Sequence, residues 1–295
     1  MFEALGISPN QLYGQLVIGL INGSFYALLS LGLAVIFGLL NVINFAHGAL
    51  YMLGAFGAYF ALTLFGINYW GALILVPLGM ACIGAFIERT MLRRLYQLDH
   101  LYGLLLTFGL ALILEGVFRH YYGASGIPYS APKELQGPLN LGFMVLPLYR
   151  AWVILVSLAL CFVTWFLIER TRLGAVLRAS TENPTLVQAF GINVPLLLTL
   201  TYAGGVALAG IAGVLAAPIY QVNPAMGSNL IIVIFAVVVV GGMGSIMGAI
   251  ITGYALGILE GLTKVFYPPA SAIVIFAVMA IVLMVRPAGL FGRGE

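Results

Sequence analysis

The side chains best suited to bind a polar solute are Asn41, Asn44 and His47, which recur at intervals of three inside a long apolar stretch. On a helix, residues at this spacing share one face. Amide and imidazole groups in apolar surroundings must find partners in the protein or line a wet cavity. Two interpretations stay open: the group shapes a polar pathway, or it hydrogen-bonds neighbouring helices and holds a helix break in place. For Asn22 and Ser24, earlier in the stretch, the second interpretation is favoured.

Catalytic motifs do not emerge from the sequence. The three histidines, His47, His100 and His120, form no H-E-x-x-H pair and no metal-ligand spacing, and there is no Ser/His/Asp set. The phosphate-binding pattern G-x-x-x-x-G-K-[ST] does not occur either. We therefore expect no enzymatic activity, no metal and no cofactor bound by this chain, so that any ATP hydrolysis takes place on another chain.

The elements that position these polar groups are apolar helices. Residues 4–87 and 183–259 contain no Asp, Glu, Lys or Arg. Overall the chain is 62% hydrophobic and 7% charged, whereas soluble domains have about 25% charged residues. A charged side chain in mid-helix costs roughly 2.5–3.5 kcal/mol in a bilayer, so uncharged stretches of this length indicate a membrane protein.

Spanning helices need roughly 20 apolar residues each, and the apolar runs predict nine of them. They lie near 12–38, 46–65, 69–87, 101–118, 150–168, 196–217, 228–243, 246–263 and 270–286. The predicted fold is all-α, a polytopic transmembrane helical bundle of about eight or nine spans, treated as a single domain over residues 1–295. At two places, a broken or re-entrant element is an alternative to two complete spans. These are the stretch 36–54 and the pair of runs around Gly241–Gly248.

The second of these places carries Gly242, Gly244 and Ser245. It also echoes the first, because His47 and Met247 are each followed by Gly-Ala and by a later glycine. Broken helices at corresponding positions of two repeats indicate a binding site in transporters. Gly-Ala pairs recur by chance in a chain with 37 glycines, so the echo is only a weak indication.

The orientation follows from the Lys and Arg residues, which are retained on the cytoplasmic side. Nine spans with an external N-terminus place eight arginines inside: Arg89, Arg93, Arg94, Arg170, Arg172, Arg178, Arg286 and Arg293. Arg119, Lys133, Arg150 and Lys264 then lie outside, together with a proline-rich loop at about 120–149. The C-terminus is predicted to be cytoplasmic. The N-terminal sequence lacks the basic region of a cleaved signal peptide, so the first span is expected to stay in the mature protein.

One predicted cytoplasmic connection, about 169–195, is too long for a simple turn. Within it, Asn183 is suited to cap a short helix, Pro184 suits its first turn, and Gly191 suits the left-handed position after its end. So short a helix is unstable alone in water, so its apolar side must pack against other residues. This side consists of Leu186, Val187, Ala189 and Phe190. The support is either the protein's own membrane domain or a separate cytoplasmic partner.

Two further patterns favour structural roles. Glycines four apart, at Gly19 and Gly23 and at Gly253, Gly257 and Gly261, allow close helix packing, more often within one chain than between subunits. The pairs Glu115/Arg119 and Glu260/Lys264 have the favourable acid-first spacing for ion pairs on a helix. A proton relay through Glu115 is the less favoured alternative.

Three stretches of the chain resemble permeases of the LivH/LivM type, the branched-chain amino acid family of ABC transporters. The N-terminal one, NGSFYALLSLGLAVIFGLLNVINFAHGALYMLGAF, covers residues 22–56, and VVVVGGMGSIMGAIITGYALGILEGL covers 237–262. The third, GAVLRASTENPTLVQAFGINV, is similar to the cytoplasmic coupling segment of such permeases. The short N-terminus and the total length look more like LivH than LivM.

The resemblance implies a permease subunit in the cell inner membrane that translocates branched-chain amino acids. Its implied partners are a second permease subunit (LivM-like or a copy of itself), two cytoplasmic ATPase subunits that bind ATP and Mg²⁺, a periplasmic substrate-binding protein and membrane lipid, with no nucleic acid. Coupling to the ATPase would involve Arg178, Glu182, Asn183, Pro184, Leu186, Val187, Phe190 and Gly191. The predicted translocation path comprises Asn22, Asn41, Asn44, His47, Gly48, Gly242, Gly244 and Ser245. Permeases for urea or short-chain amides share these signatures, and a stand-alone secondary transporter or channel is the alternative from another class.

Overall fold

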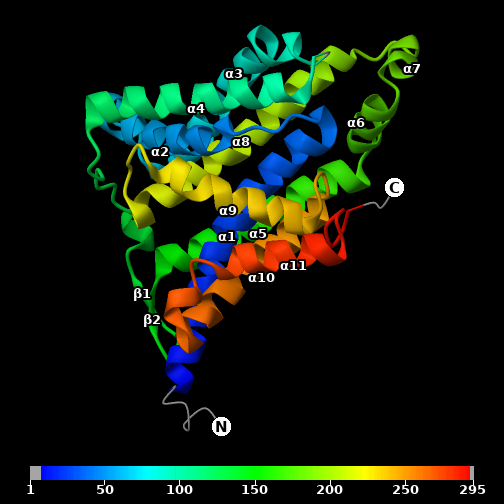
Figure 1. The fold of residues 1–295 in the computed structure, drawn as a ribbon. Helices are drawn as coiled ribbons and strands as arrows, with labels where there is room; N and C mark the ends of the chain where they lie inside the picture. The colour runs from blue at the N-terminus through cyan, green and yellow to red at the C-terminus, as the bar shows by residue number, and fades with distance from the viewer. Residues whose placement is uncertain (1–7, 97, 293–295) are drawn as a thin grey trace. The chain divides into compact units, whose positions relative to one another are not determined.

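The computed structural model describes residues 8–96 and 98–292, and these residues form eleven α-helices and one short β-hairpin (Figure 1). The helices are α1 (Pro9–Leu40), α2 (Ala46–Phe65), α3 (Tyr69–Thr90), α4 (His100–Tyr122), α5 (Leu148–Arg170), α6 (Arg172–Glu182), α7 (Pro184–Ala189), α8 (Val194–Tyr220), α9 (Met226–Gly241), α10 (Ile246–Phe266) and α11 (Val274–Val285). The strands are β1 (Pro138–Asn140) and β2 (Val145–Pro147). Arg293, predicted to be cytoplasmic, and the N-terminal residues 1–7 lie outside the described residues.

Seven of the described helices are long and apolar enough to cross a membrane: α1, α2, α3 with the turn that follows it to Arg94, α4, α5, α8 and α10. The predicted all-helical membrane architecture is confirmed, and each predicted span falls on a helix. The number of full-length spans is lower than predicted because α9 has 16 residues and α11 has 12. At 1.5 Å per residue, neither reaches across a hydrocarbon core of about 30 Å.

Within the described residues the chain forms two compact units. The first contains α1 up to Ser30, residues 131–161 and residues 232–292. The second contains residues 31–130 and 162–231. The boundaries fall inside α1, α5 and α9, so three helices contribute residues to both units.

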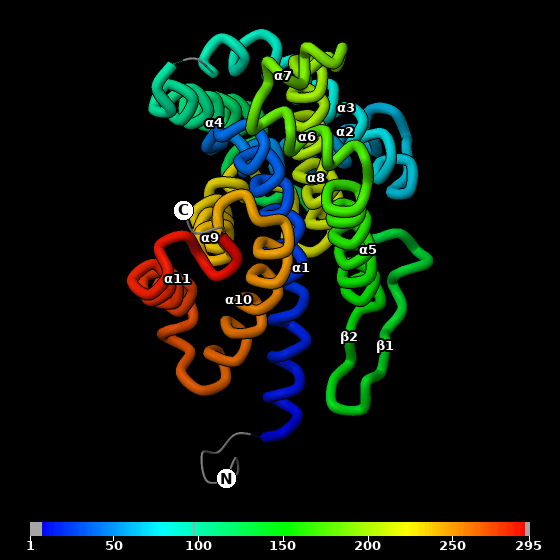
Figure 2. The backbone as a smooth tube through the Cα atoms, turned by 90° about the vertical axis from the view of Figure 1, so that its right-hand side faces the viewer, coloured from blue at the N-terminus to red at the C-terminus, as the bar shows by residue number. Residues whose placement is uncertain are grey.

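In the first unit, α1 and α10 pack backbone to backbone (Figure 2). A Cβ atom added to Gly257 would come within 2.4 Å of the Gly23 Cα atom, and one at Gly253 within 2.5 Å of the Ala27 backbone. The prediction that these glycine faces pack within the chain is therefore confirmed. Beside this contact, Glu260 accepts a hydrogen bond from the Tyr26 hydroxyl at 2.7 Å and pairs with Lys264 at 2.5 Å, as the spacing predicted.

In the second unit, α8 packs against both α2 and α3, and α4 packs against α2. The largest buried side chains between these helices are Tyr51, Phe56 and Tyr202. Gly54 of α2 lies so close to Gly210 of α8 that a Cβ atom would come within 2.5 Å of the Gly210 carbonyl oxygen. Small residues thus allow the tight helix contacts that membrane interiors favour.

The loop predicted at about 120–149 begins after α4 and contains the hairpin. Strands β1 and β2 pair antiparallel, with Leu139 opposite Leu146. At the start of the loop, Ile127 forms an isolated bridge with Val222. Tyr129 is buried here, and this burial, with a smaller contribution from Tyr69, raises the pKa of its phenol from 10.0 to about 12.

Candidate coupling segment and membrane-embedded site

The short helix predicted between Asn183 and Gly191 is present as α7. The Asn183 side chain accepts a hydrogen bond from the Leu186 backbone N–H at 3.0 Å, and Pro184 is the first helical residue. Gly191 follows the helix with φ at +81°, the left-handed region that glycine occupies without a steric penalty. These three local predictions are confirmed. The cap at Asn183 and the left-handed Gly191 define the two ends of α7 and stabilise its end turns.

Sequence reasoning missed α6, an 11-residue helix that precedes α7 directly. Thr171 caps it by accepting a hydrogen bond from the Gly174 backbone N–H at 3.5 Å. The guanidinium group of Arg178 on α6 lies 3.8 Å from the Glu169 carboxylate, measured from nitrogen to oxygen. It also donates a hydrogen bond to the Ile168 carbonyl at the end of α5. The long predicted connection is therefore a pair of helices, with α6 tied back to the span before it (Figure 1).

The apolar side of α7 is covered only in part. Val187 is buried, whereas 54% of Leu186 and 78% of Phe190 remain exposed in the described chain. Glu182, at the end of α6, is exposed as well. Fully burying a Leu or Phe side chain contributes about 1.5–3 kcal/mol. Within the described chain, only Val187 of the apolar side of α7 packs against other residues as predicted. Leu186 and Phe190 form an exposed apolar surface.

The first helix break, in the second unit, covers residues 41–45. Asn41 is exposed and has φ at +56°, a conformation uncommon for residues other than glycine. The backbone of the break is held by Thr107 of α4, whose hydroxyl donates to the Ile43 carbonyl and accepts from the Phe45 N–H, each at 3.1 Å. Thr107 thus satisfies two of the backbone groups that the break leaves without helical partners.

The prediction that Asn41, Asn44 and His47 share one helix face is wrong, because residues 41–44 are not helical. Asn44 and His47 are fully buried, and Asn44 donates a hydrogen bond to the Tyr202 hydroxyl of α8 at 3.2 Å. The break turns Asn44 toward the interior of the unit and leaves Asn41 on its surface. Thr107 and Tyr202, which hold the break, were not among the predicted site residues.

The second break, in the first unit, covers residues 242–245. Gly242 and Gly244 have φ at +98° and +85°, and the Ser245 hydroxyl caps α10 by accepting from the Gly248 N–H at 3.1 Å. Asn22 is half-buried on α1 of the same unit. The eight predicted path residues are therefore divided between the two units: Asn22, Gly242, Gly244 and Ser245 in one, and Asn41, Asn44, His47 and Gly48 in the other.

Comparison with known proteins identifies the family. Residues 15–283 match the family described as branched-chain amino acid transport system, permease component. The chain belongs to this family. As a permease component it is a transport subunit rather than an enzyme, and it is a multi-pass membrane protein, as predicted.

Relatives match this permease over nearly its whole length. The high-affinity branched-chain amino acid transport system permease protein BraD of Pseudomonas aeruginosa is 33% identical, over 95% of this chain and 96% of the relative. The corresponding protein LivH of Escherichia coli K12 is 31% identical over the same shares. A probable LivH of Methanocaldococcus jannaschii is 30% identical, over 92% of this chain and 90% of the relative. A solved structure, PsaBC from Streptococcus pneumoniae in complex with Fab, aligns with 91% of the permease and 89% of that chain at a TM-score of 0.47 and 15% identity.

The permease also contains a buried acid that sequence reasoning missed. Glu88, near the end of α3, is fully buried. Its carboxyl group accepts hydrogen bonds from the Thr199 hydroxyl of α8 at 2.6 Å and from the Tyr96 hydroxyl at 3.0 Å. Burial and the neighbouring Glu88 raise the pKa of the Tyr96 phenol well above its ordinary value. The hydrogen bond from Thr199 to Glu88 therefore links α8 to α3, and α8 is the helix that directly follows α7.

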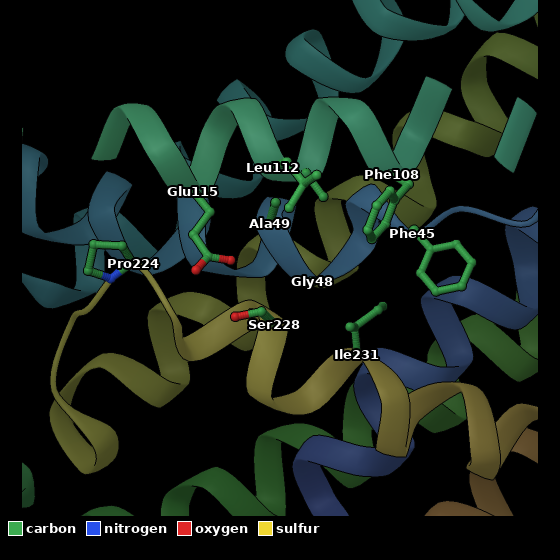
Figure 3. A pocket seen from close by; sticks show the side chains of 11 residues that line it. Phe45, Gly48, Ala49, Phe108, Leu112, Glu115, Pro224, Ser228 and Ile231 are labelled. Carbon is green, nitrogen blue, oxygen red and sulfur yellow. The ribbon is translucent and has the colours of Figure 1, made fainter. Parts of the chain in front are cut away.

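A pocket of ≈ 70 Å³ lies in the second unit between α2, α4 and the first turns of α9 (Figure 3). Its walls are mainly hydrocarbon, with one carboxylate and one hydroxyl. They are formed by Phe45, Gly48, Ala49, Phe108, Ala111, Leu112, Glu115, Pro224, Gly227, Ser228 and Ile231. Glu115 forms the predicted ion pair with Arg119, at 2.6 Å. Of the predicted path residues, only Gly48 lines this pocket.

Proposed function

We propose that the chain forms part of the translocation path of an ATP-driven importer for leucine, isoleucine and valine. The family and the names of the relatives support this substrate class. ATP and Mg²⁺ would be bound by two partner ATPase subunits, and a periplasmic binding protein would deliver the substrate. The second permease subunit is either a LivM-like chain or a second copy of this one.

The observation that carries the proposal is the exposed apolar surface of α7. This helix is capped by Asn183 and ends before the left-handed Gly191, and its Leu186 and Phe190 side chains are exposed. A capped helix with two exposed apolar side chains suits a groove on a cytoplasmic partner, because docking removes that surface from water. Force from nucleotide-driven closure would then enter α8, which begins at Val194.

The proposed orientation places α6 and α7 in the cytoplasm and the loop after α4 outside. The arginines near the ends of α3 and α5 and on α6 support it, because basic residues are retained on the cytoplasmic side. This orientation corresponds to a multi-pass protein of the cell inner membrane. The predicted cytoplasmic C-terminus is part of the same proposal.

Reconstitution in liposomes tests the function. The chain with its second permease subunit, ATPases and binding protein should take up labelled leucine only when ATP is supplied. Omitting the ATPases should abolish uptake, whereas uptake by this chain alone under an ion gradient would overturn the proposal in favour of a secondary transporter. Excess valine should compete with leucine. Competition by urea or acetamide in its place would favour the permeases for urea and short amides.

A further inference from the structure

The pocket between α2, α4 and α9 has the size of a small aliphatic side chain. A single water needs a cavity of roughly 10–15 Å³, and a cavity of about 150 Å³ takes up benzene. At ≈ 70 Å³, the pocket accommodates a few methyl and methylene groups and excludes a complete amino acid. The side chains of Phe45, Phe108, Leu112 and Ile231 converge on it from α4, from α9 and from the break before α2 (Figure 3). Phe45 and Phe108 meet edge to face, with ring centroids 6.0 Å apart.

Charge is placed at one end of this apolar pocket. Glu115 and Arg119 are the only Asp, Glu, Lys or Arg residues of α4, which also carries His100 and His120. Ionisable residues within membrane spans are costly, and they commonly mark the route of a substrate or ion. Figure 3 shows the Glu115 carboxylate directed toward the Ser228 side of the pocket, and Arg119 follows one turn further along α4.

The location within the fold also suits a binding site. Helix α2 begins at Ala46, directly after the break held by Thr107, so the pocket lies against this break and the first turn of α2. In transporters, backbone that leaves the helical conformation commonly lies beside the substrate site. Gly48 of α2 and Gly227 of α9 are packed so closely that a Cβ atom on Gly227 would overlap the Gly48 backbone, and this contact forms one wall.

We propose that this pocket is the subsite for the aliphatic side chain of a zwitterionic amino acid on its way through the permease. The branched side chain fills the space between Phe45, Phe108 and Ile231. The ammonium group binds the Glu115 carboxylate, and the amino acid carboxylate faces Arg119, so the ion pair on α4 matches the charges of the substrate head group. This inference rests on the proposed function and adds to it the residues that recognise the substrate.

Photolabelling tests the subsite without the binding protein. Photo-leucine, a leucine analogue with a diazirine in its side chain, is added to the purified permease pair, irradiated and mapped by mass spectrometry. Label is expected on the segments that contain Phe45, Phe108, Leu112 and Ile231, and excess leucine should remove it while glycine should not. Label confined to other segments, or label that leucine does not remove, would overturn the proposal.

Filling the pocket provides a matched pair of variants. Ala111 lines the pocket, so Ala111→Leu places three additional carbons in it, whereas Ala280→Leu makes the same change on an exposed position of α11. Differences of one methylene in an apolar pocket change recognition by about 10- to 200-fold. Ala111→Leu should reduce photo-leucine labelling at least about 10-fold, and Ala280→Leu should not. Normal labelling of Ala111→Leu would contradict the subsite.

The carboxylate is tested by a second pair of variants. Removing a hydrogen bond to a charged group costs about 1.5–3 kcal/mol, or roughly 10-fold or more in affinity. Glu115→Gln should therefore weaken competition by leucine about 10-fold, while competition by 4-methylpentanoate, which lacks the ammonium group, stays unchanged. Glu134→Gln removes an exposed loop carboxylate and should change neither. Equal weakening of both competitors by Glu115→Gln would indicate a structural role and overturn the assignment.

Failure of the subsite can be distinguished from failure of the proposed function. ATP-dependent leucine uptake by the complete wild-type transporter is measured in the same preparation. Uptake without competable labelling of the pocket would refute the subsite and leave the function in place. Absence of ATP-dependent uptake would refute the function itself.

Discussion

The hydrogen bond between Thr199 and Glu88 should be an anchor for α8, and Thr199→Val tests it. Valine has nearly the same shape as threonine but cannot donate a hydrogen bond. The substitution removes the 2.6 Å bond from the Thr199 hydroxyl to the fully buried Glu88 carboxyl and leaves that oxygen without its donor. An unsatisfied buried acceptor costs about 1–3 kcal/mol, and more when it is charged. We therefore expect the free energy of unfolding to fall by at least about 1 kcal/mol more than in a matched control.

The control is Thr201→Val, two residues further along α8. Both threonine hydroxyls donate to the backbone carbonyl four residues earlier, Thr199 to Pro195 at 2.9 Å and Thr201 to Leu197 at 2.8 Å. Only Thr199 also bonds Glu88. The difference between the two variants in equilibrium unfolding, measured in detergent micelles, therefore isolates the bond to the acid. Equal unfolding free energies would refute the view that Glu88 anchors α8.

Three further outcomes follow from local geometry. Gly191→Val should weaken association with the ATPase subunits while membrane insertion stays normal, because φ at +81° costs a β-branched residue about 1–2 kcal/mol; unchanged co-purification of the ATPases would contradict this. Gly257→Ala should lower the unfolding free energy by about 1–3 kcal/mol, because its Cβ atom would come within 2.4 Å of Gly23, whereas Gly116→Ala meets no atom within 4 Å and serves as the control. The folded state raises the pKa of Tyr129 from 10.0 to about 12, so its contribution to stability is complete below pH 10 and is lost as the pH rises toward 12. The melting temperature of Tyr129→Phe should therefore fall less between pH 8 and pH 11.5 than that of the wild type. Equal falls in the two proteins would refute the raised pKa of Tyr129.

Features that depend on short stretches of sequence were predictable. The caps of α7 could be predicted because Asn183, Pro184 and Gly191 each act on backbone groups within a few residues. Close packing of the glycine faces of α1 and α10 within the chain could be predicted, because glycines four apart leave one helix face without side chains. Both ion pairs had the i,i+4 spacing that determines their geometry.

Features that depend on distant residues were not predictable. The break at 41–45 is held by Thr107, and nothing near Asn41 indicates that partner. Regular spacing suggested a shared helix face, but residues 41–44 are weak helix formers, and a hydroxyl from α4 bonds the backbone groups that the break leaves free. Glu88 lay at the edge of a predicted span, where an acid is commonly solvated; its burial depends on Thr199, 111 residues later. Helix α6 was missed because its polar composition resembles that of a loop.

Cross-linking at Phe190 tests the central claim most directly, namely that α7 receives force from a cytoplasmic ATPase. Cys82 and Cys161 are first replaced by serine, a single cysteine is placed at Phe190, and a short bifunctional reagent is applied to membranes that contain the complete transporter. A control cysteine at Tyr121, exposed near the end of α4, lies on the proposed outer side. We predict that the Phe190 position cross-links to an ATPase subunit and that the Tyr121 position does not. A Phe190 cysteine that forms no such cross-link, and that reacts only with reagents added to the exterior of intact cells, would contradict this account.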